Sequence, residues 1–258
     1  PVQFTYSPTC YGDLMDFFNP GSNLDSLYFW NFGDSQTNQL KEPAHYYASP
    51  GNYTVTLRVT TTRGCQSIAT KLVTVSPIPV AAFSVPPACI GSPYSLTDQS
   101  TVSSGTIISY KWNILEDSIQ LTGANQNYTF QDTGTYHVSL TVTGDIGCEK
   151  TISHIVNVYP LPIANFSFDP QVGNPPLDVQ VTDASQSGNN YSWNFGEDTI
   201  FVPDFQPSYT YNDTGLFTIT QIVTSTFGCM DTAQKNIYVI KPVLDIAVKS
   251  DSSYIKHR

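Results

Sequence analysis

The clearest pattern in this chain is a strict alternation of apolar and polar residues. Between residues 53 and 60, Tyr53, Val55, Leu57 and Val59 alternate with threonines and an arginine. Alternation with a period of two predicts a β-strand with one buried face. A similar pattern recurs over residues 136–142 and 217–223, which predicts the same long strand three times.

Shorter strands are predicted on both sides of each long strand. A proline-flanked extended stretch with one phenylalanine opens each set, because residues next to proline favour extended conformations. These phenylalanines are Phe4, Phe83 and Phe166. The predicted last strands cover residues 73–75, 155–158 and 236–239. Since no segment shows helical spacing, the pattern predicts an all-β protein.

Tryptophans mark a repeat of about 82 residues. The chain has 3 tryptophans, Trp30, Trp112 and Trp193, with nearly equal spacing. A fixed period of this kind indicates separate modules in series, and a length of 258 residues fits three small domains. We expect domains at residues 1–77, 78–160 and 161–242, and we expect residues 243–258 to begin a further module with a strand.

Aromatic residues at the repeated positions are expected to form three cores. The tryptophans are interpreted as plugs between two sheets of an antiparallel, immunoglobulin-like β-sandwich. Tyr53 and Tyr136 resemble tyrosine corners, in which the hydroxyl bonds to nearby backbone, whereas Phe217 fills the third position without a hydroxyl. Gln221 falls on the buried face of the third long strand, where we expect either a bulge or a buried amide with partners.

Two motifs identify a resemblance to a known family. The first is Tyr28-Phe29-Trp30-Asn31-Phe32-Gly33-Asp34, which returns as Tyr191-Ser192-Trp193-Asn194-Phe195-Gly196-Glu197. The second is Gly51-Asn52-Tyr53-Thr54-Val55 and its repeats. Together they resemble the PKD (polycystin-repeat) domain, in particular the tandem PKD domains of Bacteroidota surface proteins associated with gliding motility and type IX secretion. The second repeat departs from the motif at Trp112-Asn113-Ile114-Leu115.

The resemblance covers roughly residues 1–242 and has implications for fold and function. It implies three tandem PKD sandwiches, arranged end to end, that serve as extracellular spacer or adhesion modules and not as catalysts. Other modules of the same polypeptide are the partners expected first.

Composition narrows the function classes. The chain has 21 acidic and 11 basic residues and a net charge of -10, without a basic cluster, which argues against nucleic-acid binding. No apolar run approaches the roughly 20 residues that span a bilayer, so we expect no membrane segment in this stretch. The chain starts without a methionine or a signal segment, so we interpret it as a piece of a longer exported protein with an extracellular or cell-surface location.

Catalytic and metal-binding patterns are sparse. The histidines lack metal-ligand spacing, and neither a nucleophile elbow nor a phosphate loop occurs, so we do not expect an enzyme or a cofactor. Asp34 and Glu197 follow a glycine at a strand end, where a carboxylate can bind turn amides. A structural calcium ion there is the weaker alternative, because a dedicated calcium loop has a denser set of oxygen ligands.

A short pattern concerns surface modification. Asp followed by Ser or Thr and an aliphatic residue resembles the O-glycosylation acceptor of exported Bacteroidota proteins. The candidate acceptors are Ser26, Ser118, Thr199 and Thr232.

Five cysteines fall into two positional classes. Cys10 and Cys89 lie six residues after the first-strand phenylalanine, whereas Cys65, Cys148 and Cys229 lie in the last hairpin turn. Pairing within repeats, Cys10 with Cys65 and Cys89 with Cys148, would have to cross a sandwich some 25 to 30 Å long. A disulfide needs Cα atoms within about 7 Å.

We therefore expect the cysteines to link neighbouring repeats, Cys10 with Cys148 and Cys89 with Cys229. Cys65 would then await a preceding unit. Val172 takes the place of a first-class cysteine in the third repeat.

Two hypotheses for function remain open. The first is a non-catalytic spacer or adhesion array, about 110 Å long at about 3.3 Å per strand residue, that holds a functional region away from a cell. The second is a carbohydrate- or polymer-binding accessory module of a secreted hydrolase. It would use exposed rings such as Phe29, Tyr46 and Tyr209, and it predicts a coplanar row of such rings.

Overall fold

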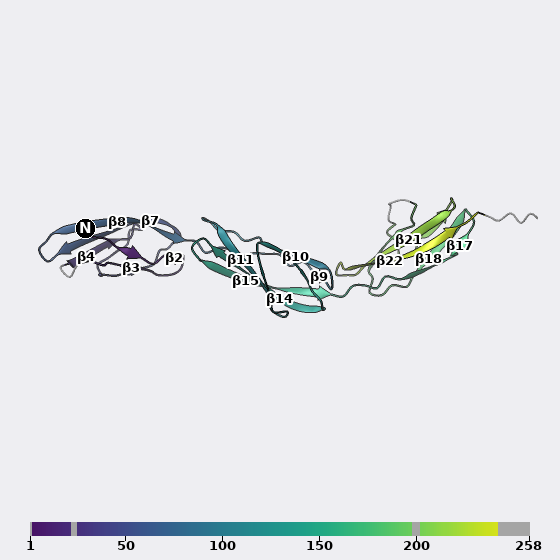
Figure 1. Ribbon diagram of the computed structural model, residues 1–258, viewed down its shortest axis with the longest axis horizontal. Coiled ribbons are helices and arrows are strands. Elements are labelled where there is room, and N and C mark those ends of the chain that lie inside the picture. The colour runs from purple at the N-terminus through teal and green to yellow at the C-terminus, as the bar shows by residue number, and fades with distance from the viewer. Residues whose placement is uncertain (1, 22–24, 198–201, 242–258) are drawn as a thin grey trace, which may run out of the picture. The chain divides into compact units, whose positions relative to one another are not determined.

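The computed structural model describes residues 2–21, 25–197 and 202–241, and their regular elements are all β-strands. The strands form three sandwiches, each with its own buried cluster of apolar residues (Figure 1). By contacts, the chain divides into two compact units, Pro1–Val158 and Tyr159–Arg258. The first unit therefore contains two sandwiches and the second contains one. The strand predicted from residue 243 onward lies outside the described residues.

The first sandwich pairs a three-stranded sheet with a five-stranded sheet. The smaller sheet has the order β1-β3-β6, and the larger has the order β2-β8-β7-β4-β5. The strands are β1 (Thr5–Tyr6), β2 (Thr9–Cys10), β3 (Met15–Phe18), β4 (Asp25–Asn31), β5 (Thr37–Asn38), β6 (Ala44–His45), β7 (Gly51–Thr61) and β8 (Gln66–Ser76). The chain thus starts in one sheet and crosses to the other, where β2 runs parallel to β8.

The second sandwich has the same plan with a different edge. A sheet of β10 and β13 faces a sheet in the order β12-β11-β14-β15-β9. The strands are β9 (Ala88–Cys89), β10 (Pro93–Thr97), β11 (Ile107–Ile114), β12 (Ile119–Thr122), β13 (Asn125–Thr129), β14 (Gly134–Gly144) and β15 (Glu149–Tyr159). A hairpin from β11 to β12 replaces the Phe-Gly-Asp turn that the motif lacks in this repeat.

The third sandwich forms the described part of the second unit. Its sheets have the orders β16-β18-β20 and β17-β22-β21-β19. The strands are β16 (Phe166–Asp169), β17 (Val172–Gly173), β18 (Leu177–Asp183), β19 (Asn190–Asn194), β20 (Ser208–Tyr211), β21 (Gly215–Thr224) and β22 (Met230–Val239). Val172 and Gly173 pair in parallel with the last strand, as Thr9 and Cys10 do in the first sandwich.

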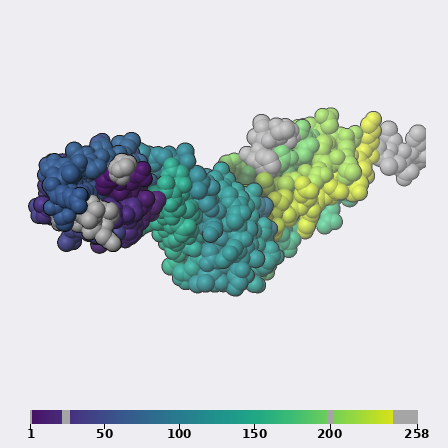
Figure 2. Space-filling model, turned by 60° about the vertical axis from the view of Figure 1, so that its left-hand side comes forward, coloured from purple at the N-terminus to yellow at the C-terminus, as the bar shows by residue number. Residues whose placement is uncertain are grey.

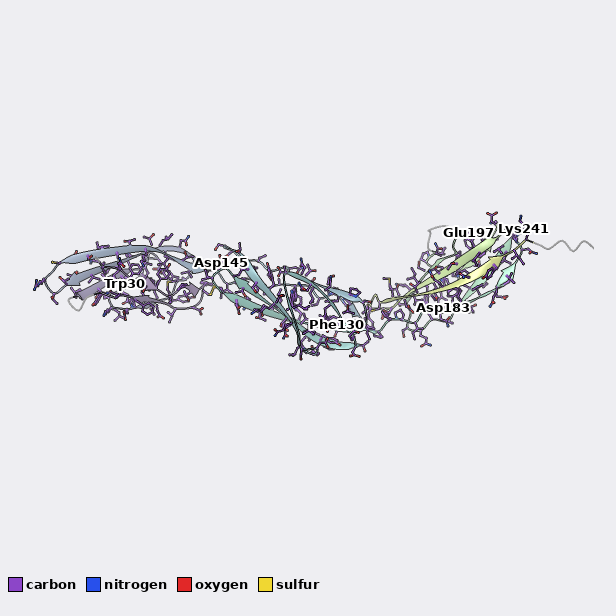
Figure 3. The ribbon with its side chains drawn as sticks, viewed as in Figure 1. Trp30, Phe130, Asp145, Asp183, Glu197 and Lys241 are labelled. Atoms are coloured by element: carbon purple, nitrogen blue, oxygen red, sulfur yellow. A yellow bond between two sulfur atoms is a disulfide. The ribbon has the colours of Figure 1, made fainter. Side chains whose placement is uncertain are left out.

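The tryptophans occupy the centre of each sandwich. Trp30, Trp112 and Trp193 are fully buried, and Trp30 is visible between the sheets of the first sandwich in Figure 3. Each indole meets the first-strand phenylalanine edge to face, at centroid distances of 5.1, 5.0 and 5.1 Å. Each indole N–H also donates to a carbonyl of the following connection, from Leu40, Gly123 or Asp204. Each tryptophan therefore lies in the core of its own sandwich.

The tyrosine corners are present in the first two repeats. The Tyr53 hydroxyl donates to the Ser49 carbonyl at 2.8 Å, and the Tyr136 hydroxyl donates to the Asp132 carbonyl at 3.1 Å. Phe217 stacks on Tyr211 at 4.7 Å and makes no such bond. Tyr136 is buried, whereas Tyr53 and Phe217 are only half-buried.

Gln221 is a buried amide and not a bulge. The strand register is continuous on both sides, since Gln221 lies opposite Trp193 on β19 and Ala233 on β22. Its amide nitrogen donates to the Asp183 carboxylate at 2.6 Å, and its carbonyl accepts from the Ser185 hydroxyl at 3.2 Å. Both polar ends are satisfied, which makes the buried position affordable.

The last strands begin well before the predicted ranges. Lys71 occupies an inward-facing position of β8, so the apolar alternation is broken there. Its ammonium lies 5.4 Å from the centre of the Phe4 ring, and Lys235 lies 5.2 Å from Phe166 in the same way. In the second repeat His154 meets the Phe83 ring at 4.7 Å. A cationic or aromatic residue thus covers the first-strand phenylalanine in each repeat.

Buried tyrosines make the second sandwich sensitive to alkali. Burial raises the pKa of Tyr94 to about 12, and its hydroxyl donates to the Pro86 carbonyl. Burial, followed by a hydrogen bond to Asp117, raises the pKa of Tyr128 to about 12 as well. In both cases the folded state keeps the proton beyond the pH at which an unfolded chain loses it.

Truncation of Trp30 tests the autonomy of the repeats. We expect Trp30→Ala to lower the free energy of unfolding of the first sandwich by about 3 to 5 kcal/mol, as large core deletions do. The third sandwich should be little affected, because arrays couple mainly through neighbours. Hydrogen exchange followed by mass spectrometry resolves the repeats, and Trp193→Ala is the matched control. Equal loss of protection in all three repeats would contradict independent cores.

A pH series tests the tyrosine assignment. The stabilising effect of the Tyr94 proton is complete below about pH 10 and is lost as pH rises toward the folded pKa of about 12. The free energy of unfolding should fall by roughly 1.4 kcal/mol per pH unit for each such group. Urea unfolding between pH 8 and 11.5 should show a shallower slope in Tyr94→Phe. The exposed Tyr238→Phe is the control, and an unchanged slope in Tyr94→Phe would refute the assignment.

Candidate functional site

A disulfide joins the first two sandwiches. Cys10 and Cys148 are bonded, with Cα atoms 5.7 Å apart and a sequence separation of 138. Cys10 ends β2 beside the last strand of the first sandwich, and Cys148 lies in the turn between β14 and β15 of the second. The exit end of one sandwich therefore meets the entry hairpin of the next. Figure 2 shows a continuous surface from the first repeat, purple to blue, to the second, teal.

The other cysteines differ in state. Cys65 is a free, exposed thiol, so it does not pair with Cys10. Cys89 and Cys229 are disulfide-bonded, and Cys229 is almost fully buried. The pairing of Cys89 with Cys229 stays a prediction.

The junction beside Cys10 is loosely packed. A cavity of about 480 Å³ lies there, lined by residues of both sandwiches and of the linker between them, including Tyr11, Ile78 and Ile152. Ile78 and Val80 in the linker stay 39% and 62% exposed. The Cys10–Cys148 bond therefore restrains a junction whose linker is partly exposed.

The turn carboxylate of the first repeat binds a histidine. Asp34 accepts a backbone hydrogen bond from Gln36 at 3.0 Å, as expected for a turn. Its other oxygen lies 2.7 Å from the Nε2 atom of His45. The His45 ring stacks on Phe32 at 3.9 Å, so the pair closes the end of the core.

Similar pairs occur in the other repeats. The Tyr209 hydroxyl donates to Glu197 at 2.6 Å, and its ring stacks on Phe195 at 4.5 Å. The Tyr128 hydroxyl donates to Asp117. This partnership was not predicted from the sequence, although in each case the acidic residue precedes the aromatic one by 11 or 12 residues. The partnership assigns the turn carboxylates a structural role that needs no ion.

Metal binding finds no further support. Within residues 2–21, 25–197 and 202–241, no group of three or more His, Cys, Asp or Glu side chains could hold a metal ion. In the second repeat the Glu116 carboxylate accepts a hydrogen bond from the backbone N–H of His137 at 2.7 Å. Its other oxygen lies 2.7 Å from the Nδ1 atom of the His137 ring. Burial raises the pKa of Glu116, but these hydrogen bonds outweigh burial and lower it.

The candidate glycosylation sites are partly accessible. Ser118 lies exposed in the β11–β12 turn, and Thr232 is exposed on β22. Thr199 and the side chain of Ser26 lie outside the described residues. Exposure permits modification at Ser118 and Thr232, and their glycosylation stays a prediction.

The three candidate ligand-stacking rings lie in different environments. Phe29 is half-buried, and the Arg58 guanidinium lies 5.1 Å from its centre. Tyr46 is 48% exposed and interacts with Tyr11, which raises its pKa. Tyr209 is half-buried in the Phe195 stack. Arg58 lies over the Phe29 ring, so Tyr46 is the most exposed of the three rings, and the coplanar row stays a prediction.

Comparisons with known proteins agree with this architecture. PKD domain family models match residues 17–77, 74–159 and 163–239. The pre-pro-metalloprotease PrtV of Vibrio cholerae is 29% identical over 127 residues, which is 49% of this chain and 14% of that protein. A microbial collagenase of Vibrio alginolyticus is 38% identical over 58 residues, 22% of this chain and 7% of that protein.

A solved structure covers one repeat. The PKD1 domain of the Vibrio cholerae metalloprotease PrtV is 29% identical, covers 31% of this chain and 96% of its own chain, and gives a TM-score of 0.27.

The chain spans only a small part of these relatives. The matched stretch therefore covers 14% of the metalloprotease and 7% of the collagenase. The described residues also contain no helix long and apolar enough to cross a membrane. Three successive matches, each with its own tryptophan-centred sandwich, show that this chain belongs to the PKD domain family.

Proposed function

We propose that the chain is a covalently linked spacer array within a larger extracellular protein. The observation that carries this proposal is the Cys10–Cys148 disulfide between two sandwiches that each have a complete core. A disulfide within a sandwich would stabilise that sandwich, whereas a disulfide between sandwiches restrains their junction. The array holds a functional region of the parent protein at a distance and has the other modules of that polypeptide as its partners.

The restraint resists bending at the junction. The proline-rich linker Pro77-Ile78-Pro79 is short and stiff. The disulfide adds a second connection between the same two sandwiches, so a hinge motion would have to stretch both. A load applied along the chain would pass through a covalent bond as well as through the linker.

The location follows from the same bond. Disulfides persist in oxidising compartments such as the cell exterior, and the Cys10–Cys148 bond is such a disulfide. We therefore place the array outside the cell or on its surface, where cell-surface or glycan ligands are further candidate partners of the array. Assignment to a Bacteroidota surface protein with type IX secretion and a role in gliding motility rests on the motif resemblance and would be tested by the flanking sequence.

A second candidate is an accessory module of a secreted hydrolase. The similarity to a metalloprotease and to a collagenase supports this function. As a carbohydrate or polymer binder it would need an open ring, and Tyr46 is the most exposed of the three candidate rings. Saturable binding in a glycan array that Tyr46→Ala abolishes would favour this function over the spacer.

Small-angle scattering tests the spacer proposal. We expect an elongated monomer with a largest dimension near the roughly 110 Å of three sandwiches in series. A double variant, Cys10→Ser with Cys148→Ser, should keep its sandwiches folded but give a broader distribution of dimensions. Cys65→Ser is the matched control, because it removes a thiol without touching the bond. A compact, near-spherical particle would refute the array.

Peptide mapping under non-reducing conditions tests the remaining pair. We expect a peptide that links Cys89 to Cys229, because each is disulfide-bonded and occupies the position that corresponds to Cys10 or Cys148. The mapping should also recover Cys10 linked to Cys148 as an internal standard. A peptide that links Cys89 or Cys229 to any other cysteine would contradict this pairing of neighbouring repeats.

A further inference from the structure

The last hairpin turn has the same backbone geometry in all three repeats. In the first repeat the N–H of Thr61 donates to the Cys65 carbonyl at 2.9 Å, and the N–H of Gly64 donates to the Thr61 carbonyl at 2.9 Å. The same two bonds link Gly144, Gly147 and Cys148, at 2.8 and 3.0 Å. They recur in the third repeat at 2.8 and 3.1 Å. The turn therefore presents its cysteine from an equivalent backbone each time.

The surroundings of the three cysteines differ. Cys148 and Cys229 are each 1% exposed and disulfide-bonded, whereas Cys65 is exposed and free. In the second repeat Cys148 of this turn is bonded to Cys10 of the preceding sandwich. Cys148, which is equivalent to Cys65, thus bonds to the sandwich that precedes its own.

The residue at the tip of the turn also contacts the preceding chain. Phe227 in the third repeat stacks on Tyr159 at 3.7 Å, and Tyr159 directly precedes the proline linker to that repeat. The Cys229 sulfur lies 4.0 Å from the Tyr159 carbonyl. Arg63 occupies the tip position in the first repeat and is exposed. An aromatic residue at the end of a preceding module would give Arg63 a cation–π partner.

We propose that the turn from Thr61 to Cys65 is a docking end for a further PKD module, to which Cys65 forms a disulfide. This inference rests on the proposed spacer function and adds one disulfide between neighbouring modules. The partner module carries a cysteine six residues after its first-strand phenylalanine, as Cys10 and Cys89 do, and precedes residue 1 in the same polypeptide.

The bond forms by ordinary thiol oxidation. The two thiols lose two protons and two electrons and become one disulfide. Oxidised glutathione or an oxidised protein dithiol takes up the electrons and protons and is released as two thiols. The first step is attack of one thiolate on the oxidant, and the second thiolate then displaces the reduced oxidant from the mixed disulfide.

An added repeat provides a direct test. A copy of residues 78–162, fused directly before Pro1 of the full chain, keeps the native spacing from Tyr159 to the next first-strand phenylalanine. The fusion is refolded with a glutathione redox pair and mapped by non-reducing mass spectrometry. We expect Cys65 linked to Cys89 of the added copy in most molecules, with the free thiol moved to Cys148 of that copy.

Matched variants make the result specific. With Cys89→Ser in the added copy, Cys65 should remain a free thiol, and Arg63→Ala should lower the yield of the new bond without affecting the Cys10–Cys148 bond. Recovery of Cys65 as a free thiol in the intact fusion, or as a dimer with Cys65 of a second molecule, would overturn the docking proposal. If the Cys10–Cys148 bond and an elongated scattering profile persist in that case, the spacer function stands and only this inference fails.

Discussion

The edge-to-face contact between each tryptophan and the first-strand phenylalanine holds the two sheets of every sandwich together. Trp30 comes from the five-stranded sheet and Phe4 from the opposite side, and both are fully buried. The indole N–H fixes the following connection through the Leu40 carbonyl, and Lys71 covers the Phe4 ring from the last strand. One buried pair therefore positions four segments that are distant in sequence, which explains why tryptophan and phenylalanine recur in a repeat where most surface positions vary.

Variation in the second repeat follows the same logic. In the first repeat Gly33 adopts a φ of +84°, and a Cβ there would lie 2.7 Å from the Thr54 carbonyl oxygen. In the turn that Gly33 permits, the Phe32 carbonyl accepts a hydrogen bond from the buried Tyr47 hydroxyl. Burial raises the pKa of Tyr47. The second repeat has a hairpin instead of this turn, and phenylalanine replaces tyrosine at position 130. A buried hydroxyl without an acceptor would destabilise the core, so the two changes belong together.

The sequence was sufficient for the strands, the repeat and the core, because alternation and periodicity depend on local residues. The predicted start of the last strands was wrong. Lys71 is polar and interrupts the apolar pattern, although its stem and charge cover the buried Phe4 ring. The acceptors of the tryptophan N–H groups could not be identified, because they are backbone carbonyls in connections of differing sequence. The link between Asp34 and His45 depends on how two turns meet in space, although the recurrence of an acid and an aromatic 11 or 12 residues apart was a usable signal.

The link between the first two sandwiches depends on a cysteine position that the third repeat lacks. Positions that repeat in every module, such as Trp30 and Gly51, build a sandwich and carry no information about its neighbour. Cys10 contributes little to its own core, yet it bonds to a turn 138 residues away. Val172 is 53% exposed where an array continuing through cysteines would place a thiol, although its strand still pairs with the last strand. Because each module folds around its own aromatic cluster, such substitutions can make or remove a link between modules without disturbing either fold. The residue six positions after the first-strand phenylalanine therefore decides whether a module can bond to the one that follows it.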